Sequence, residues 1–229
     1  MNDEKMSVLK ELKNLAEKDY KVFNSRIVPT RQVMLGVRMP ALRKIAKNTA
    51  EQKNFDFVQC DKQNIYEMIL LEGLVLSYMD KSFKDLLPYT EQFLDKVDNW
   101  AQIDATVGKF MRIAREKEDV LPVIRKWLKS DKEFVVRAGL VILLTHYVEK
   151  DRLNMIFNLS QSVVHTGHYA HMANAWLISV CMAKYPEETI AFFRKNTLDK
   201  KTHNKAIQKS RESYRISSAH KAVLHKLRG

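Results

Sequence analysis

The apolar residues of this 229-residue chain recur at spacings of three and four rather than two. Such spacing places apolar side chains on one face of an α-helix, whereas a half-buried strand needs strict alternation. Only six glycines and five prolines interrupt the pattern. Because these residues punctuate secondary structure, their scarcity favours helix nearly throughout, and no segment predicts a strand convincingly.

The periodicity assigns a helix to most of the chain. Residues 3–19 predict a first helix, and Pro40 stands at a favourable first-turn position for another that runs to about Asn48. The apolar face of the first helix comprises Met6, Leu9, Leu12, Leu15 and Ala16. Further helices are predicted at 54–60, 63–79, 82–96, 99–115, 118–129, 132–149, 151–164, 168–184, 187–195, 200–213 and 217–227.

From about residue 80 onward the predicted helices form pairs joined by short turns, each pair occupying about 35 residues, near the length of HEAT-like units. Helix pairs of this kind stack to bury their apolar faces and leave a long concave surface. The chain, 45% hydrophobic, has ample material for a core. We therefore predict one all-α domain over residues 1–229, an α-solenoid of HEAT-like antiparallel helix pairs with a concave basic cleft. A compact helical bundle is the alternative.

The formal net charge of +12 favours polyanionic partners such as nucleic acid or anionic lipid. Residues 194–229 concentrate this charge, with eleven Lys and Arg against two acids, Asp199 and Glu212. Their apolar stripe is narrow, which makes membrane attachment the weaker reading. No apolar run approaches the roughly 18 to 20 residues of a membrane span, and the first residues lack a signal-peptide pattern. A cytoplasmic protein is expected.

Neither the cysteines nor the histidines predict a metal site. Cys60 and Cys181 are isolated, so they suggest no zinc site or disulfide framework and are expected to be small core residues. His165, His168 and His171 recur at spacings that could mimic a metal cluster, but no cysteine or carboxylate accompanies them. A polar turn between helices is the preferred interpretation, and no metal or cofactor is predicted.

Four stretches, taken in order and spacing, resemble the AlkD-type DNA alkylation repair glycosylases, which are helical HEAT-like repeat proteins. They are L-G-V-R-M-P-A-L-R (35–43), N-W-A-Q-I-D (99–104), S-D-K-E-F-V-V-R-A (130–138) and A-N-A-W (173–176). The resemblance implies excision of cationic N3- and N7-alkylated purines, such as 3-methyladenine and 7-methylguanine, from duplex DNA. It also implies that no metal is used and that the base is not turned into a pocket, unlike the usual strategy of glycosylases.

The resemblance also implies a catalytic set. Trp100 and Asp104 fall on the family's Trp-x-x-x-Asp pair, Arg137 on its arginine, and Trp176 on its second cleft tryptophan. Two positions depart from the pattern: Ala101 replaces an expected acid, and Ile27 replaces an expected aromatic residue that faces the lesion. Some relatives bind DNA without excising a base, so these departures favour, as an alternative, a non-catalytic HEAT-repeat protein that recognises altered or branched DNA.

The residue types of this set suit the chemistry. Cleavage of a cationic alkylpurine builds positive charge on the sugar, so a pre-placed carboxylate such as Asp104 stabilises the transition state. Residues i and i+4 share a helix face, so Trp100 presents its indole to the same sugar. Trp176 adds a second wall. Considered singly, Asp104 is read as a solvated helix residue, with Asp98 or Asn99 as a helix cap, and Trp176 as a core residue.

Arg137 lies in an apolar stretch, where a guanidinium needs an anionic partner or a route to solvent. An internal pair with Asp104 or another carboxylate is one interpretation. A clamp on a backbone phosphate is the other, because the planar fork of arginine suits phosphate. The aromatic residues expected to serve only in packing are Trp127, Phe134 and Tyr147.

The predicted partner is double-stranded DNA that contains alkylated bases, and no obligate protein partner is evident. Phosphate contacts of this kind set affinity and register rather than sequence choice. The predicted DNA-binding residues are Arg38, Arg43, Lys200, Lys201, Lys205, Lys209, Arg211 and Arg215. A basic terminus that only keeps the protein soluble is the alternative, and an adaptor whose cleft grips an acidic peptide is a third, weaker reading of the function.

Overall fold

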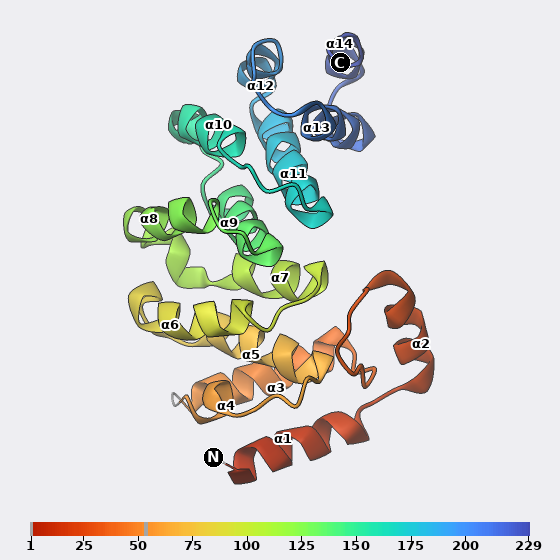
Figure 1. Ribbon diagram of the computed structural model, residues 1–229, viewed down its shortest axis with the longest axis vertical. Coiled ribbons are helices and arrows are strands. Elements are labelled where there is room, and N and C mark those ends of the chain that lie inside the picture. The colour runs from red at the N-terminus through yellow and green to blue at the C-terminus, as the bar shows by residue number, and fades with distance from the viewer. Residues whose placement is uncertain (1, 53–54) are drawn as a thin grey trace. The chain divides into compact units, whose positions relative to one another are not determined.

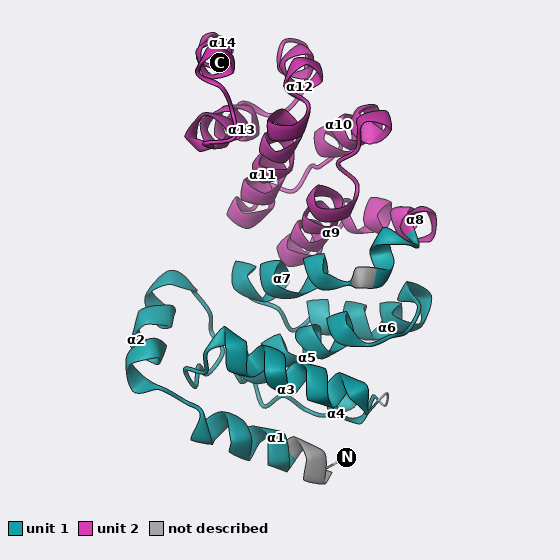
Figure 2. Cartoon of the chain, turned by 180° about the vertical axis from the view of Figure 1, so that it is seen from behind, with its two compact units in different colours: residues 1–116 teal, residues 117–229 magenta. Residues whose placement is uncertain are grey.

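A computed structural model describes residues 2–52 and 55–229 of the chain. Within these residues the fold is all-α, as predicted, and the β-contact present is an isolated bridge between Val33 and Ile65. The chain divides into two compact units, Met1–Glu116 and Lys117–Gly229, coloured teal and magenta in Figure 2. A single continuous repeat domain with a concave cleft stays a prediction.

The first unit is built around one buried helix. Its helices are α1 (Asn2–Asn14), α2 (Lys18–Ile27), α3 (Met39–Glu51), α4 (Asp56–Gln59), α5 (Tyr66–Tyr78), α6 (Phe83–Leu94) and α7 (Trp100–Thr106), as labelled in Figure 1. α5 packs against α3, α4, α6 and α7. Residues 66–77 are all buried, because α5 is apolar on nearly every side, which is typical of a helix inside a core.

The second unit stacks helices in repeated pairs. Its helices are α8 (Lys117–Trp127), α9 (Glu133–His146), α10 (Leu153–Gln161), α11 (His168–Lys184), α12 (Pro186–Phe193), α13 (Lys200–Glu212) and α14 (Ser218–Lys226). α11 packs between α9 and α13, while α8, α10 and α12 each pack on a helix of that row (Figure 1). The helices α9, α11 and α13 begin at residues 133, 168 and 200, about 35 residues apart. This unit therefore contains the helix pairs that the sequence predicts.

The prediction of one helix over 3–19 is wrong at its end. α1 stops at Asn14 and a separate helix, α2, begins at Lys18. Glu17 is extended between them because its N–H donates to the carbonyl of Gly36 at 2.9 Å. This tertiary hydrogen bond draws the chain out of the helix. Of the predicted apolar face, Leu9 and Leu12 are buried, whereas Met6, Leu15 and Ala16 are exposed.

The predicted helix over 99–115 is also wrong in its second half. α7 ends at Thr106, and two 3₁₀ segments follow at Val107–Lys109 and Met111–Ala114. Val107, Phe110 and Ile113 are buried at intervals of three. Phe110 lies between the two 3₁₀ segments with non-helical backbone angles, so the break in the helix allows all three side chains to reach the core.

Other predictions hold. Pro40 lies in the first turn of α3, where its missing N–H costs no helical hydrogen bond. Cys60 and Cys181 are both buried and unbridged, and burial raises the pKa of the Cys181 thiol to about 12. In the described part of the chain, no helix has the length and apolar character needed to cross a membrane.

Candidate active site and nucleic-acid interface

Trp100 and Asp104 lie one turn apart on α7, where residues i and i+4 share a face. The side chain of Asn99 caps this helix by accepting a hydrogen bond from the Gln102 N–H at 3.1 Å. Of the two caps that the sequence allows, the structure therefore uses Asn99 rather than Asp98. Trp100 and Asp104 are both half-buried. An indole and a carboxylate are thus held next to each other, each with part of its surface exposed.

The indole of Trp100 is tied to the end of α2. Its Nε1 donates to the carbonyl oxygen of Ile27, the last residue of that helix, at 3.4 Å. Ile27 itself is 49% exposed. The position where the sequence departs from the expected aromatic residue therefore lies directly beside Trp100.

Asp98 holds the loop that follows α2 against the start of α7. One carboxylate oxygen accepts hydrogen bonds from Thr30 Oγ1 at 2.7 Å and Asn99 Nδ2 at 2.9 Å. The other accepts from the backbone N–H of Arg31 at 2.7 Å. A carboxylate with three donors is a strong link, since hydrogen bonds to charged groups exceed neutral ones in strength. Asp98 thereby fixes the loop beside Trp100.

A buried pair of amides extends this link into the core. Gln102 Nε2 donates to Gln32 Oε1 at 2.6 Å and to the Tyr66 carbonyl at 3.2 Å, and Gln32 Nε2 donates to the Lys96 carbonyl at 2.9 Å. Gln32 is 7% exposed and Gln102 is fully buried. The sequence interpretation missed both residues. The available signal was Gln102 within N-W-A-Q-I-D, on the turn that Asn99 caps.

In the second unit, Arg137 lies on α9 and is only 5% exposed. Its Nη1 donates to the backbone carbonyl of Tyr169 at 2.9 Å. A buried guanidinium is tolerated when its donors find acceptors, and this carbonyl is one of them. The phosphate-clamp role stays a prediction.

Trp176 lies on α11, half-buried, at a hollow of about 450 Å³ in the surface of the second unit. The cations around the hollow are Lys184, Lys209 and Arg215, and Glu212 is its acid. Tyr214, 88% exposed, lines it as well. Trp176 is therefore not a fully buried core residue, and it stands beside two of the predicted DNA-binding residues.

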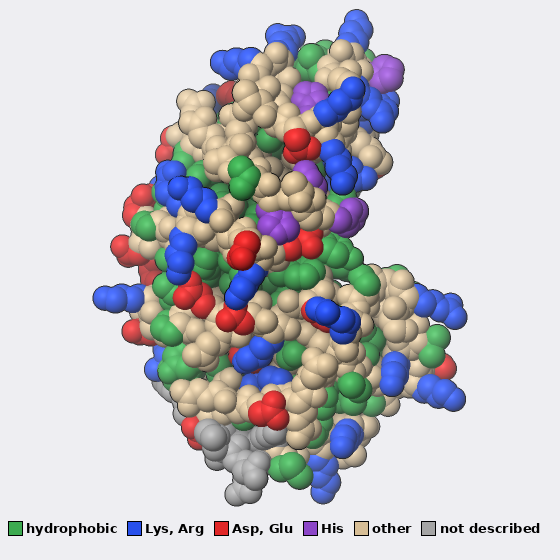
Figure 3. Space-filling view, viewed as in Figure 1, with side chains coloured by type: hydrophobic (Ala, Val, Ile, Leu, Met, Phe, Trp, Pro, Cys, Tyr) green, Lys and Arg blue, Asp and Glu red, His purple; other side chains and the backbone are tan. Residues whose placement is uncertain are grey.

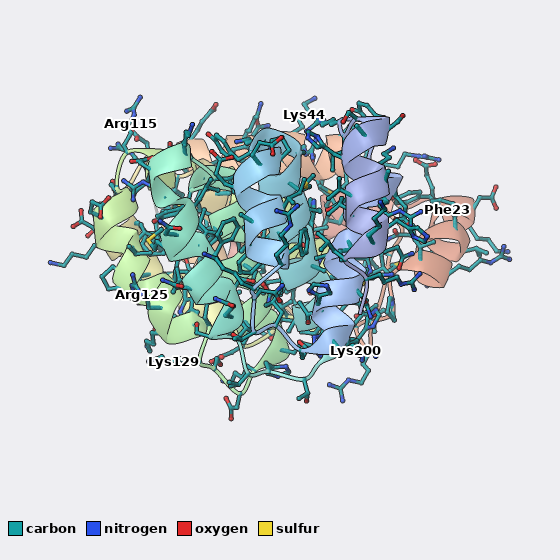
Figure 4. The ribbon with its side chains drawn as sticks, turned by 90° about the horizontal axis from the view of Figure 1, so that it is seen from above. Phe23, Lys44, Arg115, Arg125, Lys129 and Lys200 are labelled. Atoms are coloured by element: carbon teal, nitrogen blue, oxygen red, sulfur yellow. The ribbon has the colours of Figure 1, made fainter. Side chains whose placement is uncertain are left out.

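All the predicted DNA-binding cations of the second unit except Arg215 are on α13. Lys200 is exposed at its first turn (Figure 4), and Lys201, Lys205, Lys209 and Arg211 follow along the helix. Lys201 and Lys205 line a second hollow, together with His168 and His171 of α11. Figure 3 shows Lys, Arg and His side chains gathered over this part of the unit. This surface has the charge that a phosphate backbone requires.

The predicted cations of the first unit lie at the start of α3. Arg38 precedes this helix, and its Nε donates to the Glu17 carboxylate at 2.8 Å. This hydrogen bond lowers the pKa of the Glu17 carboxyl. The guanidinium also lies 4.8 Å from the ring centre of Tyr20. Arg43 is exposed on α3. Arg38 therefore braces α2 against α3, while a phosphate contact by either arginine stays a prediction.

The expected packing residues behave differently from one another. Trp127 and Tyr147 are buried, whereas Phe134 is half-buried with its ring centre 5.5 Å from that of Tyr169.

The three histidines do not all lie in one turn: His165 precedes α11, and His168 and His171 belong to its first turns. The prediction of a turn holds only for His165.

The predicted catalytic residues are divided between the two units, Trp100 and Asp104 in the first and Arg137 and Trp176 in the second. A single site formed by all four stays a prediction.

A protein-family model described as DNA alkylation repair enzyme matches residues 8–215.

The chain belongs to this family. The match runs over residues 8–215 of the 229, so a role in DNA alkylation repair rests on most of the chain rather than on one motif. No curated protein sequence gives a significant match.

Proposed function

We propose that the protein is a monofunctional DNA glycosylase. It hydrolyses the N-glycosidic bond of cationic N3- and N7-alkylated purines in duplex DNA. The observation that carries the proposal is the half-buried carboxylate of Asp104 one turn after the anchored indole of Trp100. The family match supports the substrate class.

The reaction needs charge stabilisation more than acid catalysis. A purine alkylated at N3 or N7 already carries positive charge, so it leaves without being protonated, and positive charge then develops on the deoxyribose. A carboxylate fixed in advance beside that sugar favours the transition state over the ground state. Asp104 supplies this charge and orients the water that attacks C1′.

The other residues take supporting roles. The indoles of Trp100 and Trp176 present electron-rich faces to the sugar, each worth roughly 0.5 to 2 kcal/mol toward a cation. Arg137 holds a backbone phosphate with its planar fork. The resemblance to the AlkD-type glycosylases implies that the base is not drawn into a pocket.

The decisive experiment replaces Asp104 by Asn, which keeps the shape and removes the charge. Methylated duplex DNA is incubated with purified protein, and the released 7-methylguanine and 3-methyladenine are quantified by chromatography. Excision is expected to fall about 100- to 1,000-fold, the range measured when one preorganised stabilising group is removed. Affinity for undamaged duplex is expected to change by less than threefold. Equal excision by both proteins refutes the assignment.

Asp119→Asn is the matched control, since Asp119 is an exposed carboxylate on α8. It makes the same change of charge, so a general effect of net charge on DNA binding would appear in both variants. Excision by Asp119→Asn is expected to equal that of the unchanged protein.

The second candidate is a non-catalytic protein that recognises altered or branched DNA. Ile27 and Ala101 favour it, because an aromatic residue and an acid are missing beside Trp100. Tight binding of a four-way junction with no release of free base from methylated DNA would establish this candidate. Release of alkylated base by the purified protein excludes it.

A further inference from the structure

Helix α2 has its apolar residues on the outside. Among its residues, all of which the structure describes, Asn24 alone is buried, at 7% exposure. Phe23 is 58% exposed, Ile27 49% and Val22 45%. A helix at the surface of a protein ordinarily buries its apolar face and exposes its polar one. Contiguous exposed apolar surface of this kind marks a binding site.

The exposed residues of α2 are not the result of a loose helix. On the inner side, Asn24 Nδ2 donates to Met34 Sδ at 3.4 Å, and the Val28 N–H closes the last turn on the Asn24 carbonyl at 2.9 Å. Trp100 Nε1 holds the carbonyl of Ile27. The Arg38 guanidinium covers the Tyr20 ring on the same helix. α2 is therefore held in place from behind while its apolar side chains point outward.

Helix α2 and the residues just beyond it carry more cations than acids. Lys18, Lys21 and Arg26 of α2 are exposed, as is Arg31 just beyond it, against one acid, Asp19. Figure 3 shows hydrophobic and basic side chains together over this helix, and Figure 4 shows Phe23 on its outer side. Arg26 adjoins Ile27 in the sequence and Arg31 follows four residues later, so the apolar tip has cations at its C-terminal end, which matches the chemistry of DNA, whose stacked bases lie between two rows of phosphates.

We propose that Phe23 and Ile27 insert between neighbouring base pairs next to the alkylated nucleotide. Arg26 and Arg31 contact the flanking phosphates. Residues i and i+4 stand on one face of a helix, so these two side chains form a single wedge. Apolar wedges of this kind unstack a base step and kink the duplex. The inference rests on the proposed function, because unstacking beside Trp100 is what would expose the glycosidic bond to Asp104.

The test measures unstacking without chemistry. The duplex carries one 7-methylguanine with 2-aminopurine as its neighbour, and binding is followed in the Asp104→Asn background by 2-aminopurine fluorescence and by anisotropy. A saturating amount of protein is expected to raise the fluorescence. Adding Phe23→Ala is expected to abolish most of this rise and to weaken binding of the damaged duplex about tenfold, within the range for loss of one stacked side chain. Phe23→Trp is expected to retain the rise.

Val164→Ala is the matched control, because Val164 is an apolar residue of the second unit that is 79% exposed. It should leave both signals unchanged. Thermal unfolding of Phe23→Ala should match the unchanged protein, since Phe23 is exposed, and this excludes misfolding as the cause of any loss.

Two results overturn the inference. One is a full fluorescence rise with Phe23→Ala. The other is sedimentation in which Phe23→Ala turns a dimer into a monomer, which would make this face a contact between copies of the chain. Failure of the proposed function looks different: the unchanged protein would release no base, while the fluorescence rise and its dependence on Phe23 would remain.

Discussion

Helices α2 and α5 belong to the same unit and distribute their residues in opposite ways. α5 buries residues 66–77, including the carboxylates of Glu67 and Glu72, both of which are 0% exposed. α2 buries Asn24 and exposes its large aliphatic and phenyl side chains. The apolar residues of α5 therefore stabilise the core, whereas those of α2, on our proposal, contact DNA.

The two helices are connected through Glu67. Its carboxylate accepts hydrogen bonds from the backbone N–H groups of Leu35, Gly36 and Val37 at 2.8, 2.7 and 3.3 Å. A buried charge is tolerated only when its partners are in place, and here the partners are the loop between α2 and α3. The charged interior of α5 thus organises the segment that positions α2.

The largest effect is expected from Glu72→Gln, which breaks the interior of α5. Glu72 accepts hydrogen bonds from Lys96 Nζ at 2.7 and 2.9 Å and lies 3.4 Å from Lys62 Nζ. Lys62 is 3% exposed, so the change leaves a buried ammonium without its counter-charge. The free energy of unfolding in urea should fall by about 3 to 5 kcal/mol. Glu51→Gln, an exposed carboxylate of α3, should change it by less than about 0.5 kcal/mol.

The loss should depend on pH in a defined direction. Burial lowers the pKa of Lys62 below 10.5, and the attraction of Glu72 opposes that shift, so the glutamine variant lowers the pKa further. At pH values below the folded pKa of Lys62 in the variant, both folded proteins keep this lysine charged and the deficit is complete. Between that pKa and the higher folded pKa of the unchanged protein, the lysine of the variant loses its proton first, so the deficit shrinks, while the unfolded chains titrate alike and cancel. A deficit that is constant from pH 7 to 10.5 would contradict this account.

The next effect is expected from Gly36→Ala, which disturbs the contacts of the loop before α3 with Glu17 and Lys21 and so the position of α2. Gly36 has φ of +99°, and an added Cβ would lie 2.6 Å from the Glu17 carbonyl oxygen and 2.7 Å from Lys21 Cβ. The backbone strain should cost about 1 to 3 kcal/mol in urea unfolding. Displacement of α2 should also reduce the 2-aminopurine rise. Gly139→Ala is the control, since the added Cβ would lie 3.3 Å from Leu128 Cδ2 and 3.7 Å from Ile124 Cγ2, both at the ends of side chains.

Much of this fold follows from sequence because it depends on local patterns. The 3.6-residue periodicity predicts the helices of the second unit and also the helix over 63–79 that the structure contains as α5. The resemblance assigns a role to Trp100 and Asp104, and the local pattern predicts only their common face, since they are four residues apart on one short helix. These features require no knowledge of distant contacts.

The features that were missed depend on contacts between distant segments. Glu17 leaves the helix because of Gly36, and Asp98 holds the loop at Thr30 rather than capping α7. Neither partner is visible in the local pattern. The exposure of Phe23 also could not be predicted from the local pattern. An aromatic residue was expected at position 27, where the chain has Ile27, and Phe23 lies one turn earlier on α2, where the folded unit leaves its ring exposed.

The smallest effect sharpens the comparison by making one substitution in both helices. Val22 on α2 is 45% exposed and Val75 on α5 is 1% exposed. Val22→Gln should leave the free energy of unfolding within about 0.5 kcal/mol of the unchanged protein, because the amide stays in water. Val75→Gln should cost several times more, since it buries an amide without a partner. If Val22→Gln is as damaging as Val75→Gln, then α2 is packed in solution, and its apolar side chains are part of a core instead of a DNA-facing surface.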